Sequence, residues 1–207
     1  SMIPLLLFST HVVFNSEQRE RNLTMRILLP KALTRIDPAY GPLFFLAGPV
    51  RGGDDWQKRG CEEIRGSIRH FYAAIPCHYQ EGHPLLQFRV VDIENYFDRR
   101  TAWKRYYLNM AAIGGCIIFW LPCESKANPR ADNNPYAMDT RGELGEWRGR
   151  LTNDHNLRVV IGAEPDFPGL SQIQCNFNSG LGFEFPIYST LSQTILAAIR
   201  QVKAVIL

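Results

Sequence analysis

The sequence predicts an α/β domain in which a parallel sheet is covered by helices on both faces. Short continuous apolar runs, such as residues 43–47 and 116–121, are typical of strands that are buried on both faces. Segments with the helical spacing of apolar residues alternate with these runs, and this alternation favours parallel strands. A length of 207 residues, of which 45% are hydrophobic, suits one globular domain with a full core.

The elements are expected in strict alternation along the chain. The first strand is expected at residues 43–47, and it is followed by a helix at residues 56–71 with Asp54 or Asp55 as its N-cap. The other expected strands are residues 88–93, 116–121, 157–162 and 185–188, and the other expected helices are residues 101–112, 141–151 and 191–205. Because ligands of parallel sheets bind beyond the carboxyl ends of the strands, the loops after the strands are expected to carry the function.

The N-terminal part is expected to differ from the rest. Residues 1–42 are interpreted as an N-terminal extension with a possible edge strand at residues 25–29, and residues 43–207 as the main domain. The apolar start at residues 3–8 is too short to cross a bilayer, so no membrane association is expected.

Composition excludes several classes of partner. The net charge is +3 and the basic residues are scattered, which argues against a nucleic-acid-binding surface. Five cysteines without the spacing of a disulfide scaffold favour a reduced, cytoplasmic protein. Two loose clusters could in principle bind a metal, but their spacing argues against it, and no metal is expected; they are Cys77 and His78 with His83, and Cys116 with Cys123.

The loop after the first expected strand is rich in glycine. Gly48, Gly52 and Gly53 would let a ligand approach the backbone, and Arg51 could bind a phosphate or a carboxylate. The loop therefore indicates either a phosphate or ribose site or an ordinary tight turn. Its spacing is neither that of a Walker loop nor that of a dinucleotide-binding fingerprint.

A carboxylate, Glu143, is expected near the start of the helix at residues 141–151. The unpaired N–H groups and the positive dipole end of a helix start would favour the charged form, which could act as a nucleophile or hold a sugar. The alternative is a simple helix-stabilising carboxylate. Asp139 could hold sugar hydroxyls, tune Glu143 or cap the helix.

Three short motifs, in this order, give the chain a resemblance to a known family. They are Leu46-Ala47-Gly48-Pro49, Ile118-Phe119-Trp120-Leu121-Pro122 and Gly142-Glu143-Leu144-Gly145-Glu146-Trp147. Over residues 43–188 the chain resembles the nucleoside 2-deoxyribosyltransferases. The resemblance implies a flavodoxin-like sheet of about five strands and cleavage of the N-glycosidic bond of a (deoxy)nucleoside, with Glu143 attacking the anomeric carbon. No cofactor is expected. The Arg51-Gly52-Gly53 run is also similar to the loop that surrounds the nucleotide in deoxynucleoside 5′-monophosphate N-hydrolases.

One departure from this family concerns the acid that meets the base. Residues 102–121 contain no Asp or Glu, so Asp98 or Asp92 would substitute for it, or Tyr106 or Tyr107 would contact the base. Trp120 and Trp103 could stack on a base or could simply pack in the core.

These observations leave three functions open. The first is cleavage or exchange of a nucleoside base, the second is hydrolysis of a nucleoside 5′-monophosphate with Pro49, Arg51 and the glycines around the phosphate, and the third is nucleotide binding without turnover. The resemblance also implies a homo-oligomer, because members of this family complete their sites with a neighbouring subunit. Residues 164–182, which look irregular and rich in Asn, Gln and Ser, could reach such a neighbour.

Overall fold

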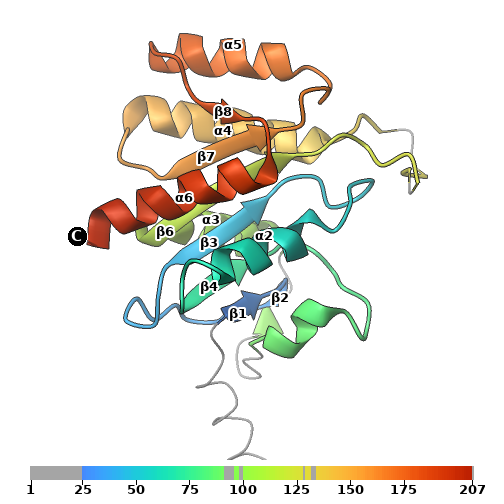
Figure 1. The fold of residues 1–207 in the computed structure, drawn as a ribbon, viewed down its shortest axis with the longest axis vertical. Helices are drawn as coiled ribbons and strands as arrows, with labels where there is room; N and C mark the ends of the chain where they lie inside the picture. Colours follow the sequence, from blue (N-terminus) through green and yellow to red (C-terminus); the bar gives the residue numbers. More distant parts are fainter. Residues whose placement is uncertain (1–24, 91–95, 98–99, 128, 132–133, 207) are drawn as a thin grey trace, which may run out of the picture.

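The computed structural model describes residues 25–90, 96–97, 100–127, 129–131 and 134–206. Its centre is a parallel sheet of six strands in the order β1-β4-β3-β6-β7-β8 (Figure 1). These strands are β1 (Met25–Leu28), β3 (Leu43–Ala47), β4 (Phe71–Ala74), β6 (Gly115–Leu121), β7 (Val159–Ala163) and β8 (Ile187–Tyr188). The helices are α2 (Trp56–Arg65), α3 (Arg100–Gly114), α4 (Met138–Asn153), α5 (Leu170–Leu181) and α6 (Leu191–Ile206), with a short 3₁₀ helix, η1 (Pro84–Phe88).

The strand order confirms the flavodoxin-like α/β fold. Counted from β3, the strands lie in the order 2-1-3-4-5, and the strand order reverses between β3 and β6. The expected edge strand is present as β1, which pairs with β4 from Met25 beside Phe71 to Leu28 beside Ala74. The predicted boundary at residue 42 therefore leaves one strand of the same sheet on its N-terminal side.

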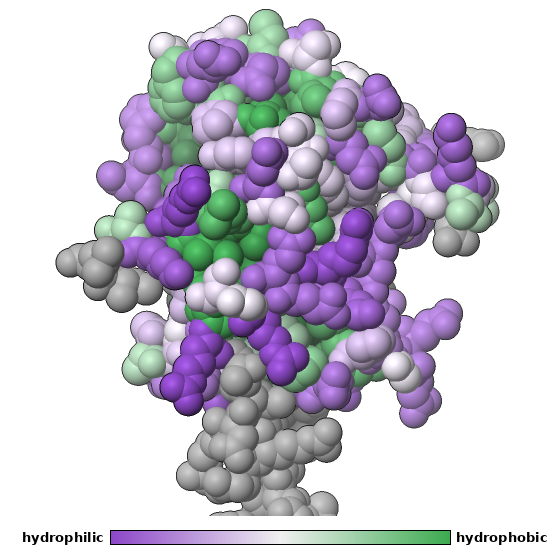
Figure 2. Space-filling view, viewed as in Figure 1, coloured by the Kyte–Doolittle hydropathy of each residue, from purple (hydrophilic) through white to green (hydrophobic). Residues whose placement is uncertain are grey.

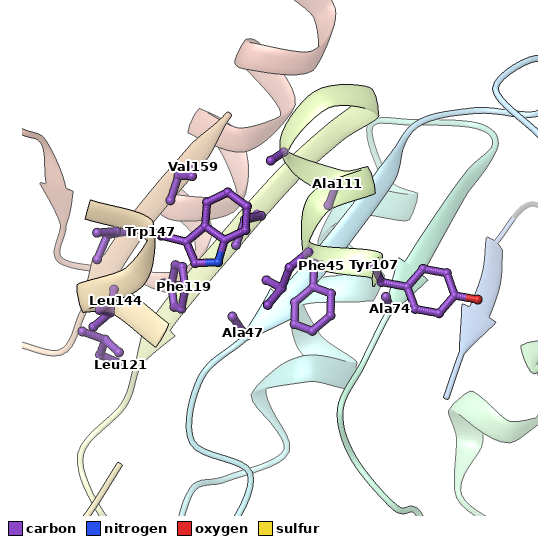
Figure 3. Packing of buried hydrophobic residues seen from close by; sticks show 14 of the residues in the cluster. Phe45, Ala47, Ala74, Tyr107, Ala111, Phe119, Leu121, Leu144, Trp147 and Val159 are labelled. Atoms are coloured by element: carbon purple, nitrogen blue, oxygen red, sulfur yellow. The ribbon is translucent and has the colours of Figure 1, made fainter. Parts of the chain in front are cut away.

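The helices form two layers, one on each face of the sheet. Along β6, Cys116, Ile118 and Trp120 belong to the core under α2 and α6. The alternate residues Ile117, Phe119 and Leu121 belong to the core under α3, α4 and α5. Figure 3 shows the second core, where Trp147 of α4 and Tyr107 of α3 lie over Phe119 and Phe45. Side chains of neighbouring residues in one strand therefore point to opposite sides of the sheet.

The surface over α2 and α6 is mostly hydrophilic, with a hydrophobic area at α6 (Figure 2). Leu196 of α6 is 45% exposed there. No helix of the described ranges is both long and apolar enough to cross a membrane.

The second strand was predicted in the wrong place. The helix at residues 56–71 ends at Arg65, and the strand after it is Phe71–Ala74 rather than residues 88–93. Gly66 stops the helix, and all four residues of β4 are buried between two neighbouring strands. Residues 84–88 form η1, Arg89 bridges to Ile27, and residues 91–95 lie outside the described part.

Two other predictions need correction. Residues 164–182 are not irregular, because α5 occupies most of them. In addition, α4 begins at Met138 instead of residue 141. A small antiparallel pair, β2 (Lys31–Ala32) with β5 (Tyr96–Phe97), lies outside the main sheet.

Candidate functional site at the carboxyl edge of the sheet

The glycine loop after β3 is held close to the backbone of β6. A Cβ atom on Gly48 would lie 2.3 Å from the carbonyl oxygen of Trp120 and 2.8 Å from the ring of Trp56. The Trp56 indole N–H donates to the carbonyl oxygen of Pro49 at 3.2 Å. Only glycine therefore fits at position 48, and the requirement comes from packing within the chain.

The loop after β6 packs directly on the glycine loop. The Ser125 N–H donates to the carbonyl oxygen of Gly52 at 2.6 Å. Gly52 has a φ of +75°, and a Cβ atom there would lie 2.8 Å from Cγ of Arg130. These two loops leave the sheet on either side of the point where strand order reverses, which is the usual ligand position in such folds.

Arg130, which sequence reasoning missed, is held in place at this edge by several hydrogen bonds. Its Nε donates to Glu124 Oε1 at 3.0 Å, and its Nη2 donates to the carbonyl oxygen of Asn134 at 2.7 Å. An open cavity of about 500 Å³ is lined by Arg51, Gly52, Pro129, Arg130 and Ala131. An Arg in the loop after the third predicted strand was the available signal, since ligands are expected at that edge.

A third loop, after β7, contacts the loop after β6. The Cys123 N–H donates to Glu164 Oε2 at 2.8 Å. The hydroxyl of Tyr136 donates to the carbonyl oxygen of Pro122 at 3.0 Å, and burial raises the pKa of this phenol. Arg141 of α4 donates to the carbonyl oxygens of Tyr136 and Pro168. The first turn of α4 is thus tied to both loops.

Glu143 lies in the second turn of α4, and not at its mouth as predicted. Because α4 begins at Met138, the N–H groups without helical partners belong to residues before Glu143. The Glu143 side chain is 18% exposed and forms an ion pair with Lys104 of α3. Both helices begin at the carboxyl edge of the sheet, so the pair lies between their N-terminal turns.

The remaining predicted residues are scattered. Asp139 is exposed in the first turn of α4, and the N-cap residue of this helix is Ala137. Tyr106 is half-buried, with its ring edge-on to Tyr107 at 5.0 Å. Trp120 is 3% exposed in the core under α2 and α6, on the opposite face of the sheet from Glu143. Asp92 and Asp98 lie outside the described residues.

A histidine and an aspartate meet at the start of α2, which sequence reasoning did not foresee. Asp55 is the N-cap of α2, and its Oδ2 lies 2.8 Å from Nε2 of His83. Because Nδ1 of His83 accepts from the Leu85 N–H, its Nε2 is the nitrogen that donates to Asp55. The ring of Tyr79 stacks on His83 at 3.8 Å. This contact fastens the segment after β4 to α2.

The two loose clusters do not assemble a metal centre. Over the ranges that the structure describes, no group of three or more His, Cys, Asp or Glu side chains could hold a metal ion. Burial raises the pKa of the Cys77 thiol to about 12.

Neither a scan against models of protein families nor a search of curated proteins finds a match to this chain.

Proposed function

We propose that this protein cleaves or exchanges the N-glycosidic bond of a nucleoside through a covalent intermediate on Glu143. The observation that carries the proposal is the half-buried Glu143 carboxylate, paired with Lys104, between the N-terminal parts of two helices at the carboxyl edge. A carboxylate beneath a sugar is what glycosyl transfer through an oxocarbenium-like state needs.

The proposed reaction has two displacements. In the first, an oxygen of Glu143 bonds to the anomeric carbon while the bond from this carbon to the base nitrogen breaks. The electron pair of the broken bond leaves with the base, which takes up a proton from Asp98 or Asp92, the acids that precede α3. In the second, a nitrogen of another base or a water molecule attacks the anomeric carbon, gives its proton back to the same aspartate and releases Glu143. The configuration of the sugar is retained.

A 5′-monophosphate is the second candidate substrate. Its support is the cavity that Arg51 and Arg130 line beside Gly52. A guanidinium group can bind two phosphate oxygens at once, and an Arg-Gly-Gly turn lets the phosphate approach the backbone. The two candidates share Glu143 and differ only in what binds at this cavity.

Product analysis tests the proposal. Purified protein is incubated with a panel of nucleosides, deoxynucleosides and their 5′-monophosphates, with and without a free acceptor base. Release of free base supports cleavage, and a new nucleoside formed only with the acceptor supports exchange. The matched pair of variants is Glu143→Gln, which should lose turnover, and Glu62→Gln, which should keep it because Glu62 pairs with Lys58 on α2, on the other face of the sheet. Binding without any product would favour a nucleotide sensor instead.

A further inference from the structure

A buried tryptophan N–H, one helical turn from Glu143 on α4, has no acceptor among the described residues. Trp147 is 1% exposed, and its Nε1 has no hydrogen-bond partner among the residues that the structure describes. Buried donors are nearly always paired, because an unpaired one keeps the full cost of its lost hydration. This N–H therefore calls for an acceptor that its neighbours in the described part of the chain do not supply.

The position of the indole relates it to Glu143. The two residues are four apart on α4, so their side chains are neighbours on the helix surface. Helical side chains lean toward the N-terminus, so the Trp147 ring covers the turn that holds Glu143. In Figure 3 the indole extends from α4 over β6, with its nitrogen on the side where Phe119 and Ala47 lie. Arg150 packs on the ring with its Cζ 4.7 Å from the centroid, which helps to hold the ring in place.

Lys104 is the present partner of the Glu143 carboxylate, and it can move. Its side chain is 28% exposed on α3, and a lysine carries a flexible stem of four methylenes. A carboxylate has two oxygens and can accept from several donors. Glu143 thus has acceptor sites for a second donor besides Lys104.

We propose that the indole N–H of Trp147 is a second donor for Glu143, which holds the carboxylate when Lys104 is withdrawn. Trp147 is then a positioning residue, and the protein has two arrangements. In one, Lys104 covers the carboxylate. In the other, Lys104 is displaced and Trp147 orients a carboxylate whose free oxygen faces outward.

The consequence for turnover rests on the proposed function. A sugar that reaches Glu143 must displace Lys104, and Trp147 would then fix the attacking oxygen. Trp147→Phe should lower kcat about tenfold with little change in KM, because one hydrogen bond to a charged group is lost in the reacting state.

The contact itself can be tested without turnover, by nuclear magnetic resonance of the indole groups. Protein labelled with nitrogen-15 has four indole signals, one for each tryptophan, and the signal missing in Trp147→Phe is that of Trp147. Lys104→Met keeps the bulk of the stem and removes the ammonium group. In this variant the Trp147 proton signal should move downfield, because a charge-assisted hydrogen bond deshields the proton.

Two controls define the outcome. In Lys104→Met combined with Glu143→Gln the downfield shift should largely disappear, and in Lys58→Met, which removes the Lys58–Glu62 pair of α2, the signal should not move. The other three indole signals report whether the fold is intact. A Trp147 signal that stays in place in well-folded Lys104→Met, or that moves equally in the double variant, overturns the inference. Failure of the glycosidase proposal would show in the product assay and leave this result untouched.

Discussion

Removal of the Arg51 guanidinium is expected to separate the two candidate substrates. If a 5′-phosphate binds at the cavity that Arg51 and Arg130 line, Arg51 contributes a charge-assisted contact of about 1.5–3 kcal/mol. Arg51→Ala should then weaken 5′-monophosphates by about tenfold to a hundredfold and leave nucleosides nearly unaffected. Titration calorimetry measures the dissociation constants of the parent protein and the variant. The same base is used with and without the phosphate, so the loss of affinity is obtained for each class of substrate.

Alanine variants of Arg59 and Arg130 are the controls for Arg51→Ala. Arg59→Ala removes an equal charge from the exposed side of α2 and should change neither affinity. Arg130→Ala should weaken both classes, since Arg130 also ties Glu124 to Asn134 within the loop. Equal losses for both classes in Arg51→Ala would mean that Arg51 holds the loop together, and unchanged monophosphate affinity would refute the phosphate site.

Three further predictions concern packing and reactivity. Gly162→Ala should destabilise the fold by about 1–3 kcal/mol in denaturant unfolding, because its Cβ would lie 1.9 Å from Oγ1 of Thr194. An unchanged denaturant concentration at the unfolding midpoint would show that α6 can shift without loss of stability. Gly145→Ala should stabilise the protein by up to about 1 kcal/mol, since its Cβ meets nothing and alanine favours the helix; a loss of stability would show that this face of α4 needs glycine. In thiol labelling at neutral pH the exposed Cys175 should react first, whereas Cys77, whose pKa is raised to about 12 by burial, should react only on unfolding; simultaneous labelling would contradict the burial.

The sequence predicted most of the sheet because its strands are marked locally. The run of β3 lies between Pro42 and Gly48, and each of its five residues is buried, so its bounds were predicted correctly. In contrast, β4 begins at Phe71, which continues the helical spacing of Ile64 and Ile68, and it contains two alanines with low strand propensity. Its strand character comes from pairing with β1 and β3, which no local pattern reports.

The site was harder to predict, because its contacts join distant segments. Glu143 was predicted at the start of a helix but lies in the second turn of α4, and its partner Lys104 lies on another helix, so no spacing rule links the two. The pairing of Asp55 with His83 likewise depends on how the segment after β4 returns to α2. For α5 the signal was weak, since only Ile173 and Phe177 of its 12 residues are buried.

The most direct test of the central claim is the search for a glycosyl group on Glu143. The protein is mixed with nucleosides that the product assay identifies as substrates, quenched with acid, digested and analysed by mass spectrometry. The proposal predicts a mass increase of one sugar residue on the peptide that contains Glu143, lost on addition of an acceptor base and absent in Glu143→Gln. Product formation by Glu143→Gln within about tenfold of the parent rate, roughly 1.4 kcal/mol in activation free energy, would contradict it.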